Sequence, residues 1–220
     1  IACFDTVFHE TMPDIAKIYP IPSQISKKYS IERYGFHGLA HQYMMQKVLK
    51  KYNAKKIITC QLGNGISISA IRNGKCIDTS MGFTPLEGVM MGTRSGSIDP
   101  SLVAFISKKE RITSERVIEL LNKESGLKGI AGESDVRELL KRKDASAKLA
   151  IDMLCYQIRK QIGAYIMALD GLDVLVLGGG LAKNPDIVSK ILQNECMADV
   201  KHMIVNTDEQ AVMFEISKKL

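Results

Sequence analysis

The chain of 220 residues contains no tryptophan, and aromatic residues make up only 6% of it. No run approaches the ~18 consecutive apolar residues that a membrane-spanning helix requires. The first residues also lack the basic region and apolar block of a secretory signal. A cytoplasmic location is therefore expected, with no association with a membrane.

Cysteine and histidine are present, but their spacing does not indicate a metal site or a disulfide framework. The five cysteines are an odd number, lie far apart and have mostly apolar neighbours. They are predicted to be reduced thiols in the core. The four histidines show no zinc spacing, so a structural metal is not expected.

Positive charge exceeds negative charge, giving a formal net charge of +6. The lysines occur as dispersed pairs and not as a stripe with interleaved aromatic residues, which argues against a nucleic-acid-binding face. A hydrophobic content of 45% indicates a globular protein, and 220 residues are enough to bury a sizeable core. The basic balance suits a small anionic substrate.

A stretch rich in glycine and proline, residues 80–96, is the most distinctive feature of the chain, and it has no amphipathic period. Gly92 and Gly96 flank Arg94, so the backbone can approach a ligand closely and the guanidinium can project from a loop. The planar fork of arginine gives paired hydrogen bonds to phosphate or carboxylate. The local pattern fits an ordinary surface turn equally well.

Two segments in the first part of the chain each present one polar side chain. Residues 1–9 are predicted to form a buried strand that presents Asp5 at its end. His37 lies between Gly35 and Gly38 and can donate a hydrogen bond to an anion near neutral pH. A structural role in the core is the simpler interpretation of this histidine.

Two glycine corners are candidate phosphate-binding elements. Gly63-Asn64-Gly65 follows an expected strand and offers free backbone N–H groups. Residues 178–180 follow another expected strand and precede a helix that begins after Asn184. Unpaired amides and a helix dipole both favour anions in such an arrangement. Either corner is also compatible with a tight turn that binds nothing.

The hydrophobic patterns predict an α/β fold. Strands are expected at residues 1–9, 56–62, 66–72, 75–79, 173–177 and 201–205, and helices at 39–52, 100–106, 113–122, 144–169, 185–194 and 210–219. Asn73-Gly74 predicts a type I′ hairpin turn between two of the strands. Ser134 is expected to cap a further helix, with Asp135 at the positive end of its dipole.

The helix expected from Asp144 to Leu169 is long and unusually apolar, so it is predicted to be the central buried helix. Leu149 is among its expected inward residues. In the helix at residues 39–52, Leu49 is likewise placed on the buried face.

Five motifs together resemble the acetate and propionate kinase family, in order and in spacing. They are Phe4–His9, Arg33–Gly38, Leu62–Gly65, Asp78–Gly88 and Gly92–Gly96. The resemblance extends from about Ala2 to the end of the chain and corresponds to the C-terminal part of that family. It implies one of the two βββαβαβα domains of the actin, Hsp70 and sugar kinase superfamily, with a ribonuclease H-like core that spans residues 1–220. The family's N-terminal domain is absent from this sequence.

The resemblance implies transfer of the ATP γ-phosphoryl group to the carboxylate of acetate or propionate, giving an acyl phosphate and ADP, with Mg²⁺ and as a homodimer. Arg94 and His37 match the residues that steady the transferring phosphoryl group, and Asp5 matches the catalytic aspartate. Phe36 and Pro85 match walls of the pocket for the acetate methyl group. Because the other half of the cleft belongs to the absent domain, the isolated chain is expected to be inactive.

The resemblance also implies a set of nucleotide contacts and one magnesium-linked residue, Glu209. The nucleotide-binding residues are Gln61, Leu62, Gly63, Asn64, Gly65, Asp135, Val136, Arg137, Gly180, Leu181, Ala182, Lys183 and Asn184. Gln61 stands where the family has a histidine, and Ala182-Lys183 replaces a Gly-Glu pair, so these positions depart from the family's pattern.

Two other interpretations stay open. One is a non-catalytic nucleotide-binding or interaction module that keeps the same fold. The other is a sugar or glycerol kinase of the superfamily, against which the loops at His37 and Arg94 argue. The sequence leaves open acetate against propionate, and ATP against another phosphoryl donor.

Overall fold

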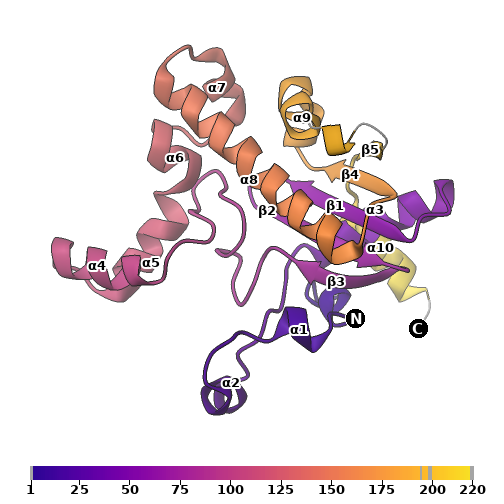
Figure 1. Ribbon diagram of the computed structural model, residues 1–220, viewed down its shortest axis with the longest axis horizontal. Coiled ribbons are helices and arrows are strands. Elements are labelled where there is room, and N and C mark those ends of the chain that lie inside the picture. The colour runs from indigo at the N-terminus through magenta and orange to yellow at the C-terminus, as the bar shows by residue number, and fades with distance from the viewer. Residues whose placement is uncertain (1, 194, 198–199, 219–220) are drawn as a thin grey trace.

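A five-stranded mixed sheet lies at the centre of the computed structural model, which describes residues 2–193, 195–197 and 200–218. The strands are β1 (Lys56–Leu62), β2 (Ile66–Arg72), β3 (Lys75–Thr79), β4 (Val174–Gly178) and β5 (Lys201–Val205). Their order across the sheet is β3-β2-β1-β4-β5 (Figure 1). The first three form an antiparallel meander, and β1, β4 and β5 run parallel to one another.

Helices alternate with strands in the second half of the chain. α8 (Ala145–Leu169) precedes β4, α9 (Pro185–Leu192) connects β4 to β5, and α10 (Glu209–Ser217) follows β5. With the meander this gives the order βββαβαβα. The predicted ribonuclease H-like core is therefore confirmed.

The sheet is packed on both faces, because successive side chains of a strand point to opposite sides. Ile58 and Cys60 of β1 belong to the larger core, which includes most of the buried face of α8. Ile57, on the other face, packs with Met44 and Val48 of α3 (Gly38–Lys51). Double-sided burial explains why β1 and β4 read as nearly continuous apolar runs.

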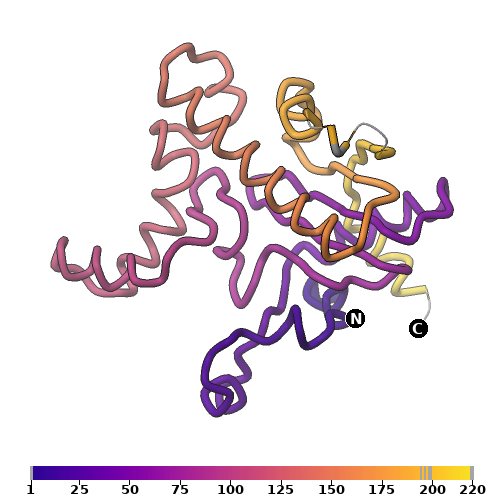
Figure 2. The backbone as a smooth tube through the Cα atoms, in the orientation of Figure 1, coloured from indigo at the N-terminus to yellow at the C-terminus, as the bar shows by residue number. Residues whose placement is uncertain are grey.

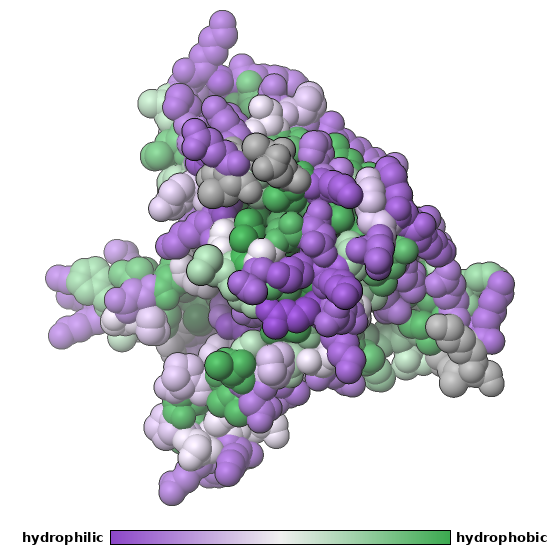
Figure 3. All heavy atoms as spheres, turned by 45° about the vertical axis from the view of Figure 1, so that its right-hand side comes forward, coloured by the Kyte–Doolittle hydropathy of each residue, from purple (hydrophilic) through white to green (hydrophobic). Residues whose placement is uncertain are grey.

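Smaller helices surround this core. They are α1 (Asp14–Lys17), α2 (Ser23–Tyr29), α4 (Ser101–Glu110), α5 (Ser114–Lys123), α6 (Gly126–Ala131) and α7 (Val136–Lys141), with the 3₁₀ turns η1 (Val7–His9), η2 (Leu181–Lys183) and η3 (Glu195–Met197). The α4–α5 pair and α2 project from the body (Figure 2). Hydrophilic residues cover much of the face in Figure 3, with apolar atoms showing in smaller areas between them. Within the described ranges, no helix combines the length and apolar character that a membrane span requires.

The start of the chain is not the strand that its pattern predicts. Residues 2–6 pair with no strand, and a 3₁₀ turn follows at Val7–His9. The apolar side chains that suggested burial are on the surface, since Phe4 is 68% exposed and Val7 is 49% exposed. The chain turns here because the Asp5 carboxylate and carbonyl bond to the start of α3 and not to a neighbouring strand.

Three smaller expectations about helices are wrong. Leu49 and Leu149 are exposed, because the buried stripes of α3 and α8 centre on Met44 and on Leu154, about a quarter turn or more away. Ser134 does not cap α7. The N-cap is Asp135, whose side chain accepts from the Arg137 N–H.

Other local expectations are confirmed. Asn73 and Gly74 both have left-handed backbone, with φ of 52° and 77°, as a type I′ turn requires. Thr113 caps α5. Cys60, Cys76 and Cys155 are buried free thiols. The helix ends expected at Asn194 and Lys219 lie outside the described residues, and α9 and α10 end at Leu192 and Ser217.

Candidate functional site

Three parallel strands end at one edge of the sheet, and the turns that follow them contact one another. A Cβ added to Gly179, whose φ is +85°, would lie 2.5 Å from the Leu62 carbonyl oxygen after β1. A Cβ added to Gly178 would lie 2.9 Å from the Thr207 methyl group after β5. Side chains other than hydrogen do not fit between these turns. Ligands of open α/β sheets bind at this end of the strands, so this edge is the candidate site.

Arg94 and His37 converge on Gly65 at this edge. A Cβ on Gly65 would lie 3.2 Å from His37 Nε2 and 3.3 Å from Arg94 Nη1. Two donors are thus directed at one glycine corner, where an anion can approach the backbone closely. Burial lowers the pKa of His37, the charge of Asp5 opposes this, and the charge of Arg94 adds to it. His37 is therefore a neutral ring near pH 7.

The loop that carries Arg94 is held by backbone hydrogen bonds to the end of α5. The Ser95 N–H donates to the Leu121 carbonyl at 2.9 Å, and the Ser125 N–H donates to the Thr93 carbonyl at 2.9 Å. The Thr93 hydroxyl donates to the Asn122 carbonyl at 2.9 Å. A loop fixed in this way presents its arginine in one position, which is what charge stabilisation requires.

An ion pair that the sequence did not indicate holds the segment before this loop. Arg33 lies 2.7 Å from the Glu87 carboxylate and also donates to the carbonyls of Thr79 and Met81 at 3.2 and 3.3 Å. Tyr19 donates to the other Glu87 oxygen. Burial, followed by the hydrogen bond to Glu87, raises the pKa of Tyr19 to about 12, so its hydroxyl stays protonated. No local pattern signals this cluster, because its members are far apart in sequence.

Asp5 fixes the start of α3 and with it the position of His37. Its carboxylate accepts from the His37 N–H at 2.6 Å and from the Leu39 N–H at 3.1 Å. Its carbonyl accepts from the Gly38 N–H at 3.0 Å. His37 adopts left-handed backbone, with φ of 58°, directly before the helix. The aspartate predicted to be catalytic is therefore also the cap of the helix that presents the histidine.

Replacing Asp5 with alanine is expected to lower the free energy of unfolding by about 1–2 kcal/mol, because two N–H groups at the start of α3 lose their acceptor. Urea unfolding followed by circular dichroism measures this change. Asp5→Asn keeps one acceptor oxygen and is expected to recover part of the loss. The control is Asp14→Ala, an exposed position in the short α1, where the change should stay within about 0.5 kcal/mol. Equal effects of the two alanine variants would contradict the capping role.

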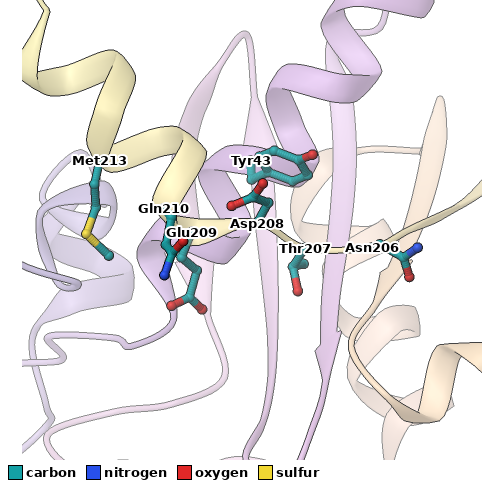
Figure 4. A pocket seen from close by; sticks show the side chains of 7 residues that line it. All are labelled: Tyr43, Asn206, Thr207, Asp208, Glu209, Gln210 and Met213. Carbon is teal, nitrogen blue, oxygen red and sulfur yellow. The ribbon is translucent and has the colours of Figure 1, made fainter.

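Glu209 lines an open pocket of about 670 Å³ at the same end of the sheet. The other residues that line it are Tyr43, Asn206, Thr207, Asp208, Gln210 and Met213 (Figure 4). Burial first, and then the charge of Asp5, raise the pKa of Glu209. Asp208 has a structural contact, because it caps α10 by accepting from the Ala211 N–H at 3.0 Å.

The glycine corner after β1 encloses the side chain of Gln61. Its Nε2 would lie 3.7 Å from a Cβ on Gly63, and its Oε1 would lie 3.3 Å from a Cβ on Gly178. Oε1 is buried and has no hydrogen-bond partner among the described residues. Buried acceptors are normally paired, so this oxygen, which faces Gly178 at the end of β4, is an exception among the described residues.

The turn after β4 contributes little through its side chains. Ala182 is buried and Leu181 packs against the larger core. The Asn184 side chain accepts from the N–H groups of Asp186 and Ile187 and so caps α9. Lys183 is exposed. Any ligand contact here therefore falls mainly to the backbone of Gly179 and Gly180, beside the Gly63–Gly65 corner.

The expected contact at Asp135–Arg137 follows a turn that adjoins the Arg94 loop. A Cβ on Gly92 would lie 3.5 Å from Ser134, so this turn adjoins the loop. Val136 is buried in the core. Asp135 and Arg137 form an ion pair with each other, with Arg137 Nη2 2.6 Å from Asp135 Oδ2. The Arg137 side chain is exposed, whereas the Asp135 side chain is partly buried and also caps α7.

The two residues expected to line the acetate pocket are both partly buried. Phe36 packs against the larger core, and its carbonyl accepts from His9 Nε2 at 3.0 Å. Pro85 lies in the segment that Arg33 and Glu87 hold in place.

Three histidines that are buried or partly buried give the fold a defined dependence on pH. Burial lowers the pKa of His9 to about 4 and holds that of His41 well below its usual value, and it also lowers that of His37. Between about 6.5 and 4 the unfolded chain therefore binds more protons than the folded chain. Acidification over this range must favour unfolding.

The free energy of unfolding is expected to fall as the pH is lowered from about 6.5 to 4, with each buried histidine contributing up to about 1.4 kcal/mol per pH unit. Urea unfolding at a series of pH values measures the slope. His9→Gln should reduce this slope by the contribution of one buried histidine. A stability that is flat over this range would show that the three rings do not stay neutral in the folded chain.

The chain matches the family model described as the acetokinase family over residues 1–219. It is 51% identical over 202 residues to an acetate kinase of Thermoanaerobacterium thermosaccharolyticum, a match that covers 87% of this chain and 50% of the relative. It is 44% identical over 233 residues to an acetate kinase of Caldicellulosiruptor saccharolyticus, covering 99% of this chain and 57% of the relative. The chain thus spans about half the length of the curated relatives it matches.

Solved structures give the same result. The acetate kinase of Porphyromonas gingivalis superposes with a TM-score of 0.94 at 35% identity, covering 98% of this chain and 62% of that one. A propionate kinase from Francisella tularensis superposes with a TM-score of 0.88 at 38% identity, covering 96% of this chain and 62% of that one. By sequence and by structure, the chain belongs to the acetokinase family.

Proposed function

We propose that this chain supplies one half of the active site of a carboxylate kinase, which transfers the γ-phosphoryl group of ATP to acetate. The observation that carries the proposal is the convergence of Arg94 and His37 on Gly65, at the sheet edge where three parallel strands end. The names of the relatives, acetate kinase and propionate kinase, support the same substrate class.

Phosphoryl transfer depends mainly on positioning and on stabilising negative charge on the equatorial oxygens. The Arg94 guanidinium offers a charged fork for these oxygens, and neutral His37 offers one N–H. Backbone N–H groups at the Gly63–Gly65 corner can hold the neighbouring phosphates. Asp5 acts at the reacting centre and also keeps His37 in place through the start of α3. Phe36 and Pro85 form apolar walls beside the acetate methyl group.

The nucleotide lies, in this proposal, across the turns after β1 and β4. Leu62–Gly65 and Gly180–Asn184 contact it largely through the backbone, since Ala182 and Asn184 already have structural contacts. Asp135–Arg137 reaches it from beside the Arg94 loop. Because Ala182-Lys183 replaces a Gly-Glu pair, contacts to the nucleoside at this turn differ from those of the family.

The residues present fit a magnesium ion. Glu209 supplies a carboxylate at an open pocket, and burial, followed by the charge of Asp5, raises its pKa, a shift that a divalent cation would oppose. Mg²⁺ prefers oxygen ligands and is commonly held by one or two carboxylates together with substrate phosphates. When bound, the ion neutralises charge on the phosphates. Glu209 would hold it.

The homodimer implied by the family resemblance stays a prediction. The choice of acetate over propionate also belongs to the proposal, since relatives of both names match the chain. A non-catalytic nucleotide-binding module is the alternative function, and it requires the same glycine corners but not the Arg94 guanidinium.

The test uses this chain joined to the N-terminal half of the Thermoanaerobacterium relative, called here the two-domain enzyme. Acyl phosphate is trapped with hydroxylamine after incubation with Mg²⁺, ATP and either acetate or propionate. Acetyl phosphate formation supports the proposal, and the ratio of kcat/KM values decides between the two acids. Nucleotide binding without acyl phosphate formation would favour the binding module instead.

A further inference from the structure

A line of hydrogen bonds leads from His37 at the site into the core of the protein. His37 Nδ1 lies 2.8 Å from Ser67 Oγ, and the same oxygen lies 2.7 Å from His41 Nε2. His41 Nδ1 in turn lies 2.7 Å from Thr59 Oγ1. Ser67, His41 and Thr59 are all fully buried. They come from β2, α3 and β1, so only the folded sheet brings them together.

The serine in the middle couples the two imidazole rings. Its hydroxyl has one hydrogen, so it can donate to only one ring and must accept from the other. Burial holds the pKa of His41 well below its usual value and also lowers that of His37, so both rings are neutral and each carries one N–H. The hydrogen bonds along this line can therefore be arranged in only two ways, which differ in the direction of donation.

Thr59 decides between the two arrangements. In the first, the Thr59 hydroxyl donates to His41 Nδ1, His41 Nε2–H donates to Ser67, and Ser67 donates to His37 Nδ1. In the reverse arrangement Thr59 accepts, and its own buried hydrogen needs another acceptor. Within the described ranges, His41 is the one side-chain partner of Thr59 Oγ1. A buried donor without an acceptor is costly, which favours the first arrangement.

We propose that Thr59, His41 and Ser67 are positioning residues that hold neutral His37 in the tautomer with its proton on Nε2. A Cβ on Gly65 would lie 3.2 Å from that nitrogen and 3.3 Å from Arg94 Nη1. The relay thus supplies a second N–H donor at the corner where Arg94 supplies a charged one. In the opposite tautomer Nε2 would carry a lone pair, and this lone pair would repel an anion. The value of this arrangement for catalysis rests on the proposed function, but the tautomer itself does not.

The test is the tautomeric state of His37 in the 220-residue chain labelled with ¹⁵N-histidine. Long-range ¹H–¹⁵N correlation spectra at pH 7.5 distinguish protonation at Nδ1 from protonation at Nε2, and loss of one signal set in His37→Gln assigns the ring. The Nε2–H form is expected to exceed the Nδ1–H form by about tenfold or more, the ratio that one buried hydrogen bond supplies. Predominant Nδ1–H in the unmodified chain would overturn the proposal without any variant.

Ser67→Ala breaks the relay beside His37 and is expected to reduce this tautomer ratio several-fold. Ser69→Ala is the matched control, because Ser69 is an equally buried serine on the same face of β2 whose hydroxyl lies 2.8 Å from Thr79 and not in the relay. It should leave the ratio unchanged. An unchanged ratio in Ser67→Ala, or an equal change in Ser69→Ala, would overturn the relay.

Kinetics of the two-domain enzyme separate this proposal from the proposed function. Ser67→Ala is expected to lower kcat about tenfold with little change in the KM for acetate, whereas Ser69→Ala is not. If the tautomer depends on Ser67 but His37→Ala leaves kcat unchanged, the relay stands and the catalytic assignment of His37 is wrong. If His37→Ala lowers kcat but the tautomer ratio of His37 is unchanged in Ser67→Ala, the catalytic assignment stands and the relay is wrong.

Discussion

Arg94→Ala in the two-domain enzyme is expected to lower kcat by roughly 10²- to 10³-fold and to change the KM for acetate much less. The reason is the position of the guanidinium, whose Nη1 would lie 3.3 Å from a Cβ on Gly65, beside the proposed path of the phosphoryl group. Negative charge on the transferring group is spread differently in the transition state than in bound ATP. An interaction directed at that charge lowers the barrier more than it strengthens ground-state binding. Steady-state kinetics with acetate and ATP measure both constants.

Two further variants sharpen this result. Arg94→Lys keeps the charge but loses the planar fork, so kcat should recover only in part. Arg116→Ala removes an exposed arginine on the neighbouring α5, where it pairs with Glu119 and Glu124, and should leave kcat unchanged. A near-normal kcat in Arg94→Ala, with the chain folded, would remove this residue from the mechanism.

The core of the fold was predictable because its signals are local. The meander followed from β-branched strands and from Asn73-Gly74, a pair whose left-handed backbone closes a two-residue hairpin. The 25-residue α8 followed from its length and apolar character. In each case the residues that determine the element lie within it, so sequence pattern and structure agree.

The parts that were not predictable depend on contacts between distant segments. The apolar start of the chain reads as a strand, yet Asp5 bonds to α3, 32 residues away from it at His37, and no strand forms. Arg33 and Glu87 look like ordinary charged residues until the fold places them 2.7 Å apart. His41 lies one turn into α3, four residues after His37, but Ser67 and Thr59 come close to it only through the strand register.

Among the site residues, too, some features could be predicted from motifs and others depend on contacts that only the fold creates. Motifs identified Arg94, His37 and the glycine corners, and the structure brings all of these together at one edge of the sheet. The same motifs could not show that Ala182 is buried in the core or that Asn184 caps α9. A family resemblance predicts which positions contact a ligand. Burial and hydrogen bonding decide which atoms at those positions are free to bind it.

A further expected result concerns the 220 residues by themselves, which should form acetyl phosphate at least about 10³-fold more slowly than the two-domain enzyme. The described residues place Arg94, His37, Asp5 and Glu209 along one edge of a sheet. The pocket at Glu209, whose lining residues are drawn in Figure 4, is open. A one-sided site leaves water around the phosphoryl group, where a higher dielectric weakens each charged contact.

The 220-residue chain is expected to lose more rate from poor positioning of its two substrates than from the weakening of charged contacts by water. Holding two reactants in line can account for ~7 kcal/mol or more of a barrier, and a single wall cannot clamp acetate and ATP together. The hydroxylamine assay is run on the 220-residue chain, on the two-domain enzyme and on both with Arg94→Ala, at equal protein concentration. Weak nucleotide binding by the short chain, measured by calorimetry, serves as the control that its glycine corners are intact. Rapid turnover by the 220 residues that Arg94→Ala abolishes would show that one side of the cleft suffices, because the same guanidinium would then be doing its chemistry without a second wall.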